Sequence, residues 1–394
     1  MSRSNIARLA IASTLIAAGL TSVAGAQSIV GLASFGVGGW RAPNAVQAGD
    51  ALGTETAGVY NFLQTVNNER GMAYNPITGN LILVSRSGLT GGATNIRVLS
   101  GSTATDLSGL STTGIGGGAF VQNMVGVGTD GRIYVGNLST NTQSGGSPFR
   151  LYRYDDSLSA TLPTQVFSSL IAYNGITAGT PRGGDSLDVI GGGAGTRVAI
   201  GYSGVVGYAV IDPTAGTAQG YNAFTPAGPL AGDFRLGITF GATSSDVIGK
   251  QTGGTAAAAP LRVTTNPGSA TNGTSVTSAT LLSGGEMAMD YTTIAGVPYL
   301  AVVDANSSVV RIYDFSNPAS PALLVSGTTT SGTLAGNGNA VGSVAWGAVS
   351  GLSATLYAMS TNQGIQAFTV TVPEPTTLGL LAGAAAMVLR RRSK

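Results

Sequence analysis

Residues 71–85, GMAYNPITGNLILVS, form the pattern that decides the fold. The first part, 71–74, is short and rich in small residues, and the last part, 81–85, is almost wholly apolar. Between them, 75–80 is a run of turn-forming residues that contains proline, glycine and two asparagines. Such a turn between two strand-like runs predicts a β-hairpin, and 95–100 supplies a third strand.

The hairpin pattern recurs along the chain at intervals of roughly 50 to 60 residues. In each copy a strand rich in small residues is followed by a turn, an apolar strand and a third strand. The second copy contains Asp130-Gly131 between apolar runs, which is a strong hairpin signal. Helical periodicity is absent from this region. The six copies begin at Gly71, Met124, Ser186, Phe234, Met287 and Val344.

Repeated hairpins that cannot bury their own faces predict an all-β fold, the β-propeller. We expect six blades, or seven if residues 49–65 contain a further unit. The sixth copy ends after its third strand, whereas 28–35 is an apolar stretch without a partner. We expect this N-terminal stretch to become the outer strand of the last blade, because ring closure removes an exposed sheet edge.

The composition excludes several classes of chemistry. The chain has no cysteine and no histidine, which rules out disulfides, thiolate nucleophiles, Cys/His zinc sites and histidine-based triads. Six of the 19 basic residues lie close to the two ends, and the only lysine between them is Lys250. The remaining chain is mildly acidic, so we expect no nucleic-acid partner.

The N-terminal end has the order of blocks that is typical of a secretory signal. Arg3 and Arg8 precede an apolar run over 9–20, and the small residues Ala24 and Ala26 follow. Residues 1–26 are therefore predicted to be a signal peptide that signal peptidase cuts after Ala26.

The C-terminal end resembles the PEP-CTERM sorting signal. A Pro-Glu-Pro motif, an apolar run over 378–389 and a basic end follow one another within 372–394. The resemblance implies an exosortase that cuts near the motif and passes the protein to the cell envelope, cell surface or extracellular matrix. The apolar run is shorter than the roughly 20 residues of a permanent span, which favours transient anchoring in the inner membrane. The motif residues are Val372, Pro373, Glu374 and Pro375, followed by Arg390, Arg391 and Arg392.

The chain between the signals, residues 27–371, carries a second resemblance. Four stretches, Glu69–Gly71, Asn123–Val127, Gly184–Val189 and Phe234–Ile238, resemble a propeller-like domain of unknown function in exported bacterial proteins. The resemblance covers about 61–370 and implies the propeller fold. It brings no activity and no catalytic residues.

Oxygen-bearing side chains stand near the start of the expected inner strands, which would ring a central channel. Together they would suit Ca²⁺ or the hydroxyls of a sugar. They are also common turn residues, and Arg70 and Arg235 stand beside two of them as alternative partners. The residues are Glu69, Asn123, Asp185, Asp233, Glu286 and Asn339.

Two further acids, Asp188 and Asp290, stand inside the expected inner strands. Burial beside the channel would raise their pKa, although a hydrogen-bonded core carboxylate is the alternative interpretation. The leading functional hypothesis is a non-enzymatic surface or matrix protein that binds a polysaccharide or another envelope protein. The alternatives are a carboxylate-dependent glycan hydrolase or lyase, and a structural component without a specific ligand. No residue is assigned as catalytic.

Overall fold

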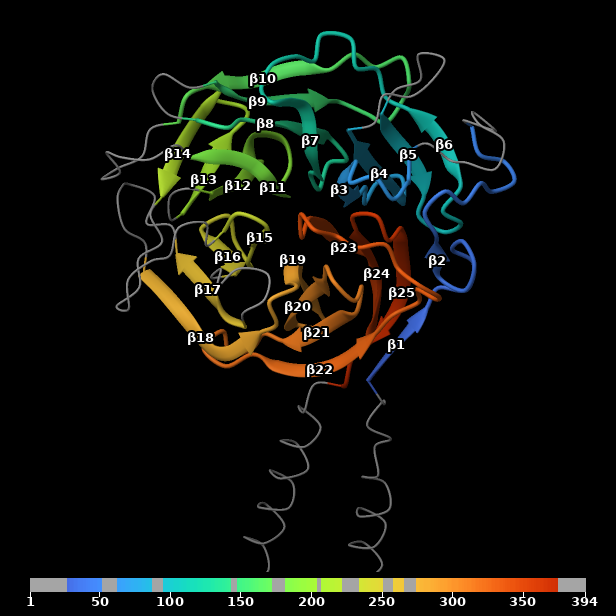
Figure 1. The fold of residues 1–394 in the computed structure, drawn as a ribbon. Helices are drawn as coiled ribbons and strands as arrows, with labels where there is room; N and C mark the ends of the chain where they lie inside the picture. Colours follow the sequence, from blue (N-terminus) through green and yellow to red (C-terminus); the bar gives the residue numbers. More distant parts are fainter. Residues whose placement is uncertain are drawn as a thin grey trace, which may run out of the picture.

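A computed structural model describes residues 27–51, 62–86, 95–142, 147–171, 181–203, 207–221, 234–250, 258–265 and 274–374. These residues form six antiparallel sheets arranged in a ring, which is a six-bladed β-propeller (Figure 1). The expected all-β fold and the blade number are confirmed, and the seven-blade alternative is wrong. The predicted signal peptide 1–26, the segment 375–394 and Asp233 lie outside the described residues.

Each blade contains four main strands that follow one another from the centre of the ring outwards. Blade 1 comprises β3 (Glu69–Tyr74), β4 (Asn80–Ser85), β5 (Ile96–Ser100) and β6 (Asp106–Gly109). Blade 2 comprises β7 (Phe120–Val127), β8 (Ile133–Leu138), β9 (Phe149–Tyr154) and β10 (Thr164–Ser169). Blade 3 comprises β11 (Arg182–Ile190), β12 (Arg197–Ser203), β13 (Tyr208–Asp212) and β14 (Thr217–Tyr221), with a 3-10 turn at Gly193–Gly195.

The second half of the ring follows the same order. Blade 4 comprises β15 (Ile238–Phe240), β16 (Asp246–Lys250), β17 (Ala259–Thr265) and β18 (Thr274–Leu282). Blade 5 comprises β19 (Glu286–Ile294), β20 (Val297–Asp304), β21 (Val310–Asp314) and β22 (Ala322–Gly327). Blade 6 comprises β23 (Gly342–Ser350), β24 (Ser353–Ser360), β25 (Ile365–Thr371) and the N-terminal β1 (Ser28–Gly31).

The N-terminal strand closes the ring, as predicted. β1 pairs antiparallel with β25, from Ser28 opposite Thr371 to Gly31 opposite Phe368. The innermost strands contact one another around the whole circle, including β23 of the last blade with β3 of the first. The closing strand ends at Gly31, which is earlier than the expected 35, because the chain turns there before it reaches β2 (Trp40–Arg41).

The sequence analysis did not predict the outer strands of the first five blades. β10 has the sequence TQVFSS and buries only Phe167 fully, and β6 has the sequence DLSG. An outer strand has one sheet neighbour and a solvent-facing edge, so it needs little of the apolar alternation that marks a strand in a sequence. The sequences of these strands therefore resemble those of polar loops.

The turn in the stretch that decides the fold also connects two blades. The side-chain oxygen of Asn75 accepts hydrogen bonds from the amides of Ile77 (2.9 Å) and Thr78 (3.2 Å), and Gly79 adopts a φ of +72° that only glycine adopts readily. The side-chain amide of Asn75 donates to the carbonyl of Gly131 in blade 2 (3.1 Å). Turn chemistry thus fixes both the hairpin and its position against the next blade.

The core lies mainly between neighbouring sheets. Between blades 5 and 6, for example, Ile312 packs in one cluster with Leu356 and Phe368, and all three are buried. Trp346 belongs to the same cluster and is 7% exposed. Full burial of one large apolar side chain contributes roughly 1.5–3 kcal/mol, so six such interfaces stabilise a chain that has no disulfide.

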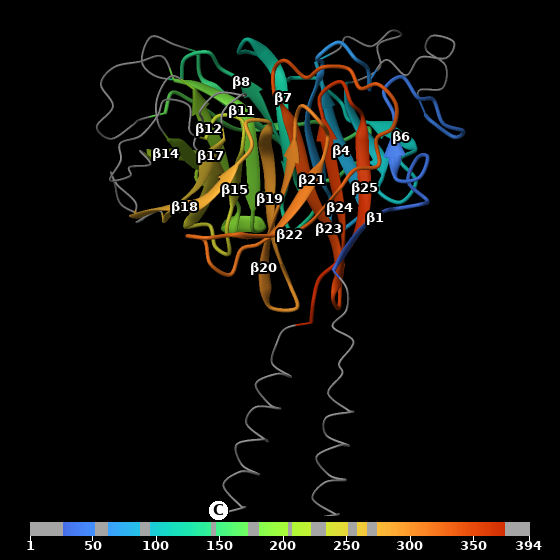
Figure 2. The same ribbon diagram turned by 60° about the horizontal axis from the view of Figure 1, so that its bottom comes forward.

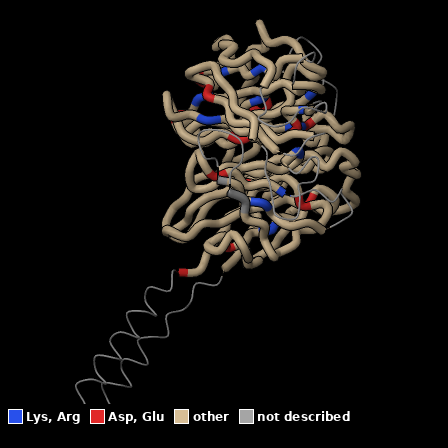
Figure 3. Tube along the Cα trace, turned by 90° about the vertical axis from the view of Figure 1, so that its left-hand side faces the viewer, with Lys and Arg blue, Asp and Glu red and all other residues tan. Residues whose placement is uncertain are grey.

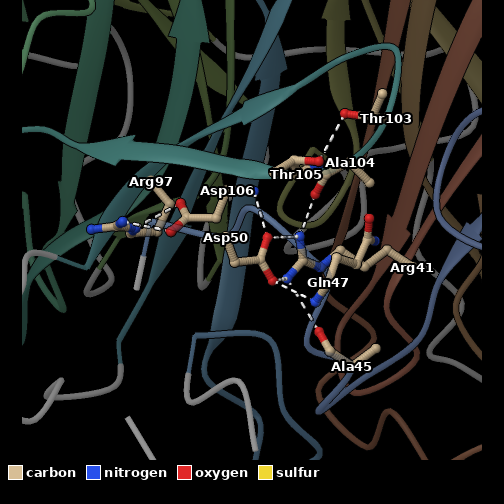
Figure 4. Close-up of polar contacts among 9 residues, drawn as sticks. All are labelled: Arg41, Ala45, Gln47, Asp50, Arg97, Thr103, Ala104, Thr105 and Asp106. Atoms are coloured by element: carbon tan, nitrogen blue, oxygen red, sulfur yellow. Dashed lines mark hydrogen bonds and ion pairs between the residues drawn. The ribbon is translucent and has the colours of Figure 1, made fainter. Parts of the chain in front are cut away.

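A buried ion pair fastens the N-terminal segment where the last blade meets the first (Figure 4). Arg41 lies in β2, which pairs with β25, and its guanidinium donates to both oxygens of Asp50 (3.0 and 2.7 Å). Both side chains are fully buried. Asp50 also accepts the backbone amide of Asp106 in β6 (2.8 Å), so the pair connects blade 6 to blade 1.

The two faces of the ring differ in what they carry. β23 and β25 both run antiparallel to β24, so the innermost strand ends on the face where β25 ends and β1 begins. We call this the terminal face, and Figure 2 shows β1 and β25 meeting there. The opposite face is where the innermost strands begin. Within the described ranges, no helix is long and apolar enough to cross a membrane.

Candidate functional site

A cavity of about 450 Å³ lies at the centre of the ring. All six innermost strands line it, and its wall reaches Thr292 and Val349 at the terminal face. Apolar side chains such as Met72 and Trp346 form part of the wall. Its volume falls within the roughly 300–1,000 Å³ of typical small-molecule sites.

Asp188 on β11 and Asp290 on β19 both line this cavity and make matching contacts. One oxygen of Asp188 accepts the amide of the following residue (2.8 Å), and the other accepts the amide of Phe240 in the next blade (2.7 Å). Asp290 repeats this arrangement with its own following amide (2.8 Å) and with the amide of Trp346 in the next blade (2.7 Å). Each carboxylate thus bridges two neighbouring blades.

Thr239 on β15 joins the two aspartates. Its hydroxyl oxygen lies 3.1 Å from Asp188 Oδ2 and 3.4 Å from Asp290 Oδ1. Burial raises the pKa of Asp188 to about 6. Burial, followed by the nearby charge of Asp188, raises the pKa of Asp290 well above its ordinary value. The two acids therefore titrate as a pair that avoids carrying two charges.

The hydrogen bonds of the pair decide what chemistry it can perform. All four carboxylate oxygens accept a backbone amide or lie beside the Thr239 hydroxyl. Cleavage of a glycosidic bond needs one acid that delivers a proton and a second that reaches carbon or water. Carboxyl oxygens that are held by backbone amides on two strands are instead fixed in position. This geometry therefore favours recognition of hydroxyl groups over acid–base catalysis.

The other predicted acids lie at the beginning of the inner strands, on the opposite face. Asp185 binds Arg182 (2.7 Å) and Arg235 (2.9 Å), one with each oxygen. Glu286 accepts the hydroxyl of Tyr313 (2.9 Å) and lies 3.4 Å from Arg311. Charged residues are sparse along the chain trace as a whole (Figure 3).

The remaining described members of the predicted ring do not share a common partner. Glu69 accepts the amide of Gln64, and burial raises its pKa. The side chain of Asn123 accepts Arg86 Nε (2.7 Å). Asn339 is exposed on the surface. No group of three or more acids able to hold a metal ion exists within the described ranges.

The sequence could not assign the partners of these acids. The suggested pairing of Arg235 with Asp233 is not tested, because Asp233 lies outside the described residues; Arg235 pairs with Asp185 of the preceding blade. It offered Arg70 as a partner of Glu69, and no ion pair joins these two side chains. Thr239 was missed altogether, because only the ring geometry places it between Asp188 and Asp290.

Comparison with known proteins supports the fold alone. No protein-family model and no curated protein matches this chain. A solved DUF4623 family protein from Bacteroides eggerthii superposes with a TM-score of 0.59 at 17% identity, over 82% of this chain and 74% of its own. Hadza microbial sialidase Hz136 superposes with a TM-score of 0.50 at 11% identity, over 77% of this chain and 66% of its own. Such low identities indicate a common architecture and leave activity open.

Proposed function

We propose that this protein is an exported β-propeller of the cell surface or extracellular matrix that binds a polyhydroxylated ligand, such as a polysaccharide segment, without cleaving it. The observation that carries the proposal is the central cavity of about 450 Å³, in which Asp188 and Asp290 are fixed hydrogen-bond acceptors. A sugar offers hydroxyl donors for such acceptors.

The rest of the cavity wall also suits a sugar. Met72, Met289 and Trp346 contribute apolar surface, and Asp188 and Asp290 contribute the polar groups. An apolar wall with a few polar groups is the usual composition of a small-molecule site. The C–H faces of a sugar ring would contact the apolar part while its hydroxyls meet the polar part.

The proposed location rests on the sequence of the two ends. Signal peptidase would remove 1–26, and an exosortase would process the chain near Glu374 after transient anchoring in the inner membrane. Glu374 is exposed at the end of the described chain. Cell fractionation tests this location: replacing Pro373 and Pro375 by alanine should leave the unprocessed chain in the membrane fraction. Unchanged release of this variant would contradict the sorting proposal.

Binding can be tested by calorimetric titration with neutral oligosaccharides and with exopolysaccharide from the producing cells. Ala348 lines the cavity and is exposed, so Ala348→Trp should obstruct the cavity without disturbing the core. The matched control is Ala322→Trp on the outer strand β22, where the alanine is also exposed. Binding should disappear in the first variant and persist in the second. Equal binding by both variants would refute the cavity as the site.

A glycan hydrolase or lyase is the second candidate, because the coupled pair Asp188 and Asp290 has raised pKa values. An acid that keeps its proton near neutral pH can act as a general acid. New reducing ends or unsaturated sugars that disappear in Asp290→Asn would support this candidate over the binding function.

A further inference from the structure

Arginines gather at the opposite face, where the innermost strands begin. Arg70 on β3 and Arg86 directly after β4 come from blade 1. Arg182 on β11 and Arg235 before β15 come from blades 3 and 4. Asp185 lies among them and is close enough to influence the pKa of both Arg70 and Arg86. The question is whether each of the four arginines has a carboxylate partner.

Asp185 is already used by two of the four arginines. Its two oxygens bind Arg182 at 2.7 Å and Arg235 at 2.9 Å. The other nearby acid, Glu69, forms no ion pair with Arg70, and burial raises the pKa of its carboxyl. Two guanidinium groups, those of Arg70 and Arg86, are therefore left without a carboxylate partner among the described residues.

Arg70 is the more deeply buried of the two arginines, with 5% of the residue exposed. Its guanidinium makes no hydrogen bond or ion pair with any residue that the structure describes, and its Nε is enclosed without an acceptor. A buried charge is normally paired, since removal from water is costly unless a partner compensates for it. The structure supplies no such partner from this part of the chain.

Among the described residues, the direct contacts of the Arg86 guanidinium are with neutral groups. Its Nε donates to the side-chain oxygen of Asn123 (2.7 Å), and its guanidinium carbon lies 3.6 Å from the centre of the Phe120 ring. Burial, followed by the positive charge of Arg70, lowers the pKa of Arg86 to about 9. The two positive charges thus act against each other, and a bound negative group would relieve this repulsion.

We propose that Arg70 and Arg86 form a binding site for an oxyanion, such as the carboxylate of an acidic sugar or a phosphate group. Guanidinium donors match the spacing of carboxylate and phosphate oxygens, and partial burial strengthens the attraction. The site lies at the beginning of the inner strands, and the cavity with Asp188 and Asp290 extends to the terminal face. It is therefore a second site, independent of the proposed saccharide cavity.

Thermal melting with defined anions tests the site. Sodium glucuronate and sodium phosphate are compared with glucose, at equal ionic strength set with chloride. At an anion concentration about 100-fold above its Kd, the melting temperature of the wild type should rise by roughly 4 °C. Glucose, which lacks the carboxylate, should give no such rise. No rise with either anion would overturn the proposal.

Variants locate the effect. Arg70→Met should lose the anion-dependent rise, and without anion it should melt at the same or a higher temperature, because an unpaired charge is gone. The matched control is Arg153→Met, which removes an arginine paired with Asp155 on the surface (2.9 Å) and should keep the rise. If Arg70→Met does not fold, the less buried Arg86→Met replaces it. An undiminished anion-dependent rise in the folded variants would refute the assignment.

Discussion

Replacing Asp188 by asparagine should change how the stability of the propeller depends on pH. The substitution keeps the size of the side chain and one acceptor oxygen but removes the titratable group. In the folded protein the pKa of Asp188 is raised from 3.8 to about 6 by burial. The unfolded chain therefore releases this proton first as the pH rises, and folding must then bear the cost of burying the charge.

The magnitude follows from the size of that shift. One pKa unit corresponds to about 1.4 kcal/mol, so the contribution of Asp188 amounts to about 3 kcal/mol. This stability is present below about pH 4 and is lost as the pH rises through about 6. Asp188→Asn lacks this loss, and it carries a separate cost of about 1–3 kcal/mol at every pH, because its amide group faces a backbone N–H.

Urea unfolding between pH 4 and pH 8 measures the effect. The free energy of unfolding of the wild type should fall by about 2.5 kcal/mol relative to Asp188→Asn over this range. The control is Asp156→Asn, which removes a carboxylate from the exposed surface. A constant difference between wild type and Asp188→Asn, or one that grows in favour of the wild type as the pH rises, would refute the argument. It would mean that the backbone amides stabilise the ionised form more than burial opposes it.

Three further predictions concern the ring itself. Arg41→Met should lower the free energy of unfolding, measured in urea, by about 3–5 kcal/mol, because it leaves the buried Asp50 carboxylate without its ion pair. A decrease of less than about 1 kcal/mol would contradict that role. Deleting residues 27–38 should expose the edge of β25 and cause association that increases with concentration in size-exclusion chromatography; a monomer as stable as the full protein would show that β1 does not close the ring. Adding calcium or EDTA should leave the melting temperature unchanged, because Asp185 and Glu286 already bind arginine and tyrosine side chains, and a rise with calcium would contradict this assignment of their partners.

The ring could be predicted because its signals are local. The hairpin at 71–85 depends on Asn75 and Gly79, which act within one turn, and the copies repeat at a period that a propeller requires. The stretch 28–35 indicated closure because the last copy was one strand short. The fourth strands were not predicted, since an outer strand such as β10 buries too little apolar surface to leave a pattern.

The sites depend on contacts between blades, which a single sequence does not display. Asp188 and Asp290 were singled out by their position in inner strands, yet their partners Phe240 and Trp346 lie about fifty residues further along the chain. The predicted ring of acids assumed that side chains at equivalent positions would converge. Instead, an arginine that follows no repeat pattern can occupy such an acid, as Arg182 does with Asp185.

The proposal that the central cavity binds an intact saccharide is tested most directly by one titration with product analysis. An oligosaccharide is titrated into the wild type and into Ala348→Trp, and the same samples are then analysed for new reducing ends and unsaturated sugars. The structure predicts binding to the wild type alone and complete recovery of the unmodified saccharide. Cleavage products that require Asp188 and Asp290, or equal binding by the obstructed variant, would contradict it.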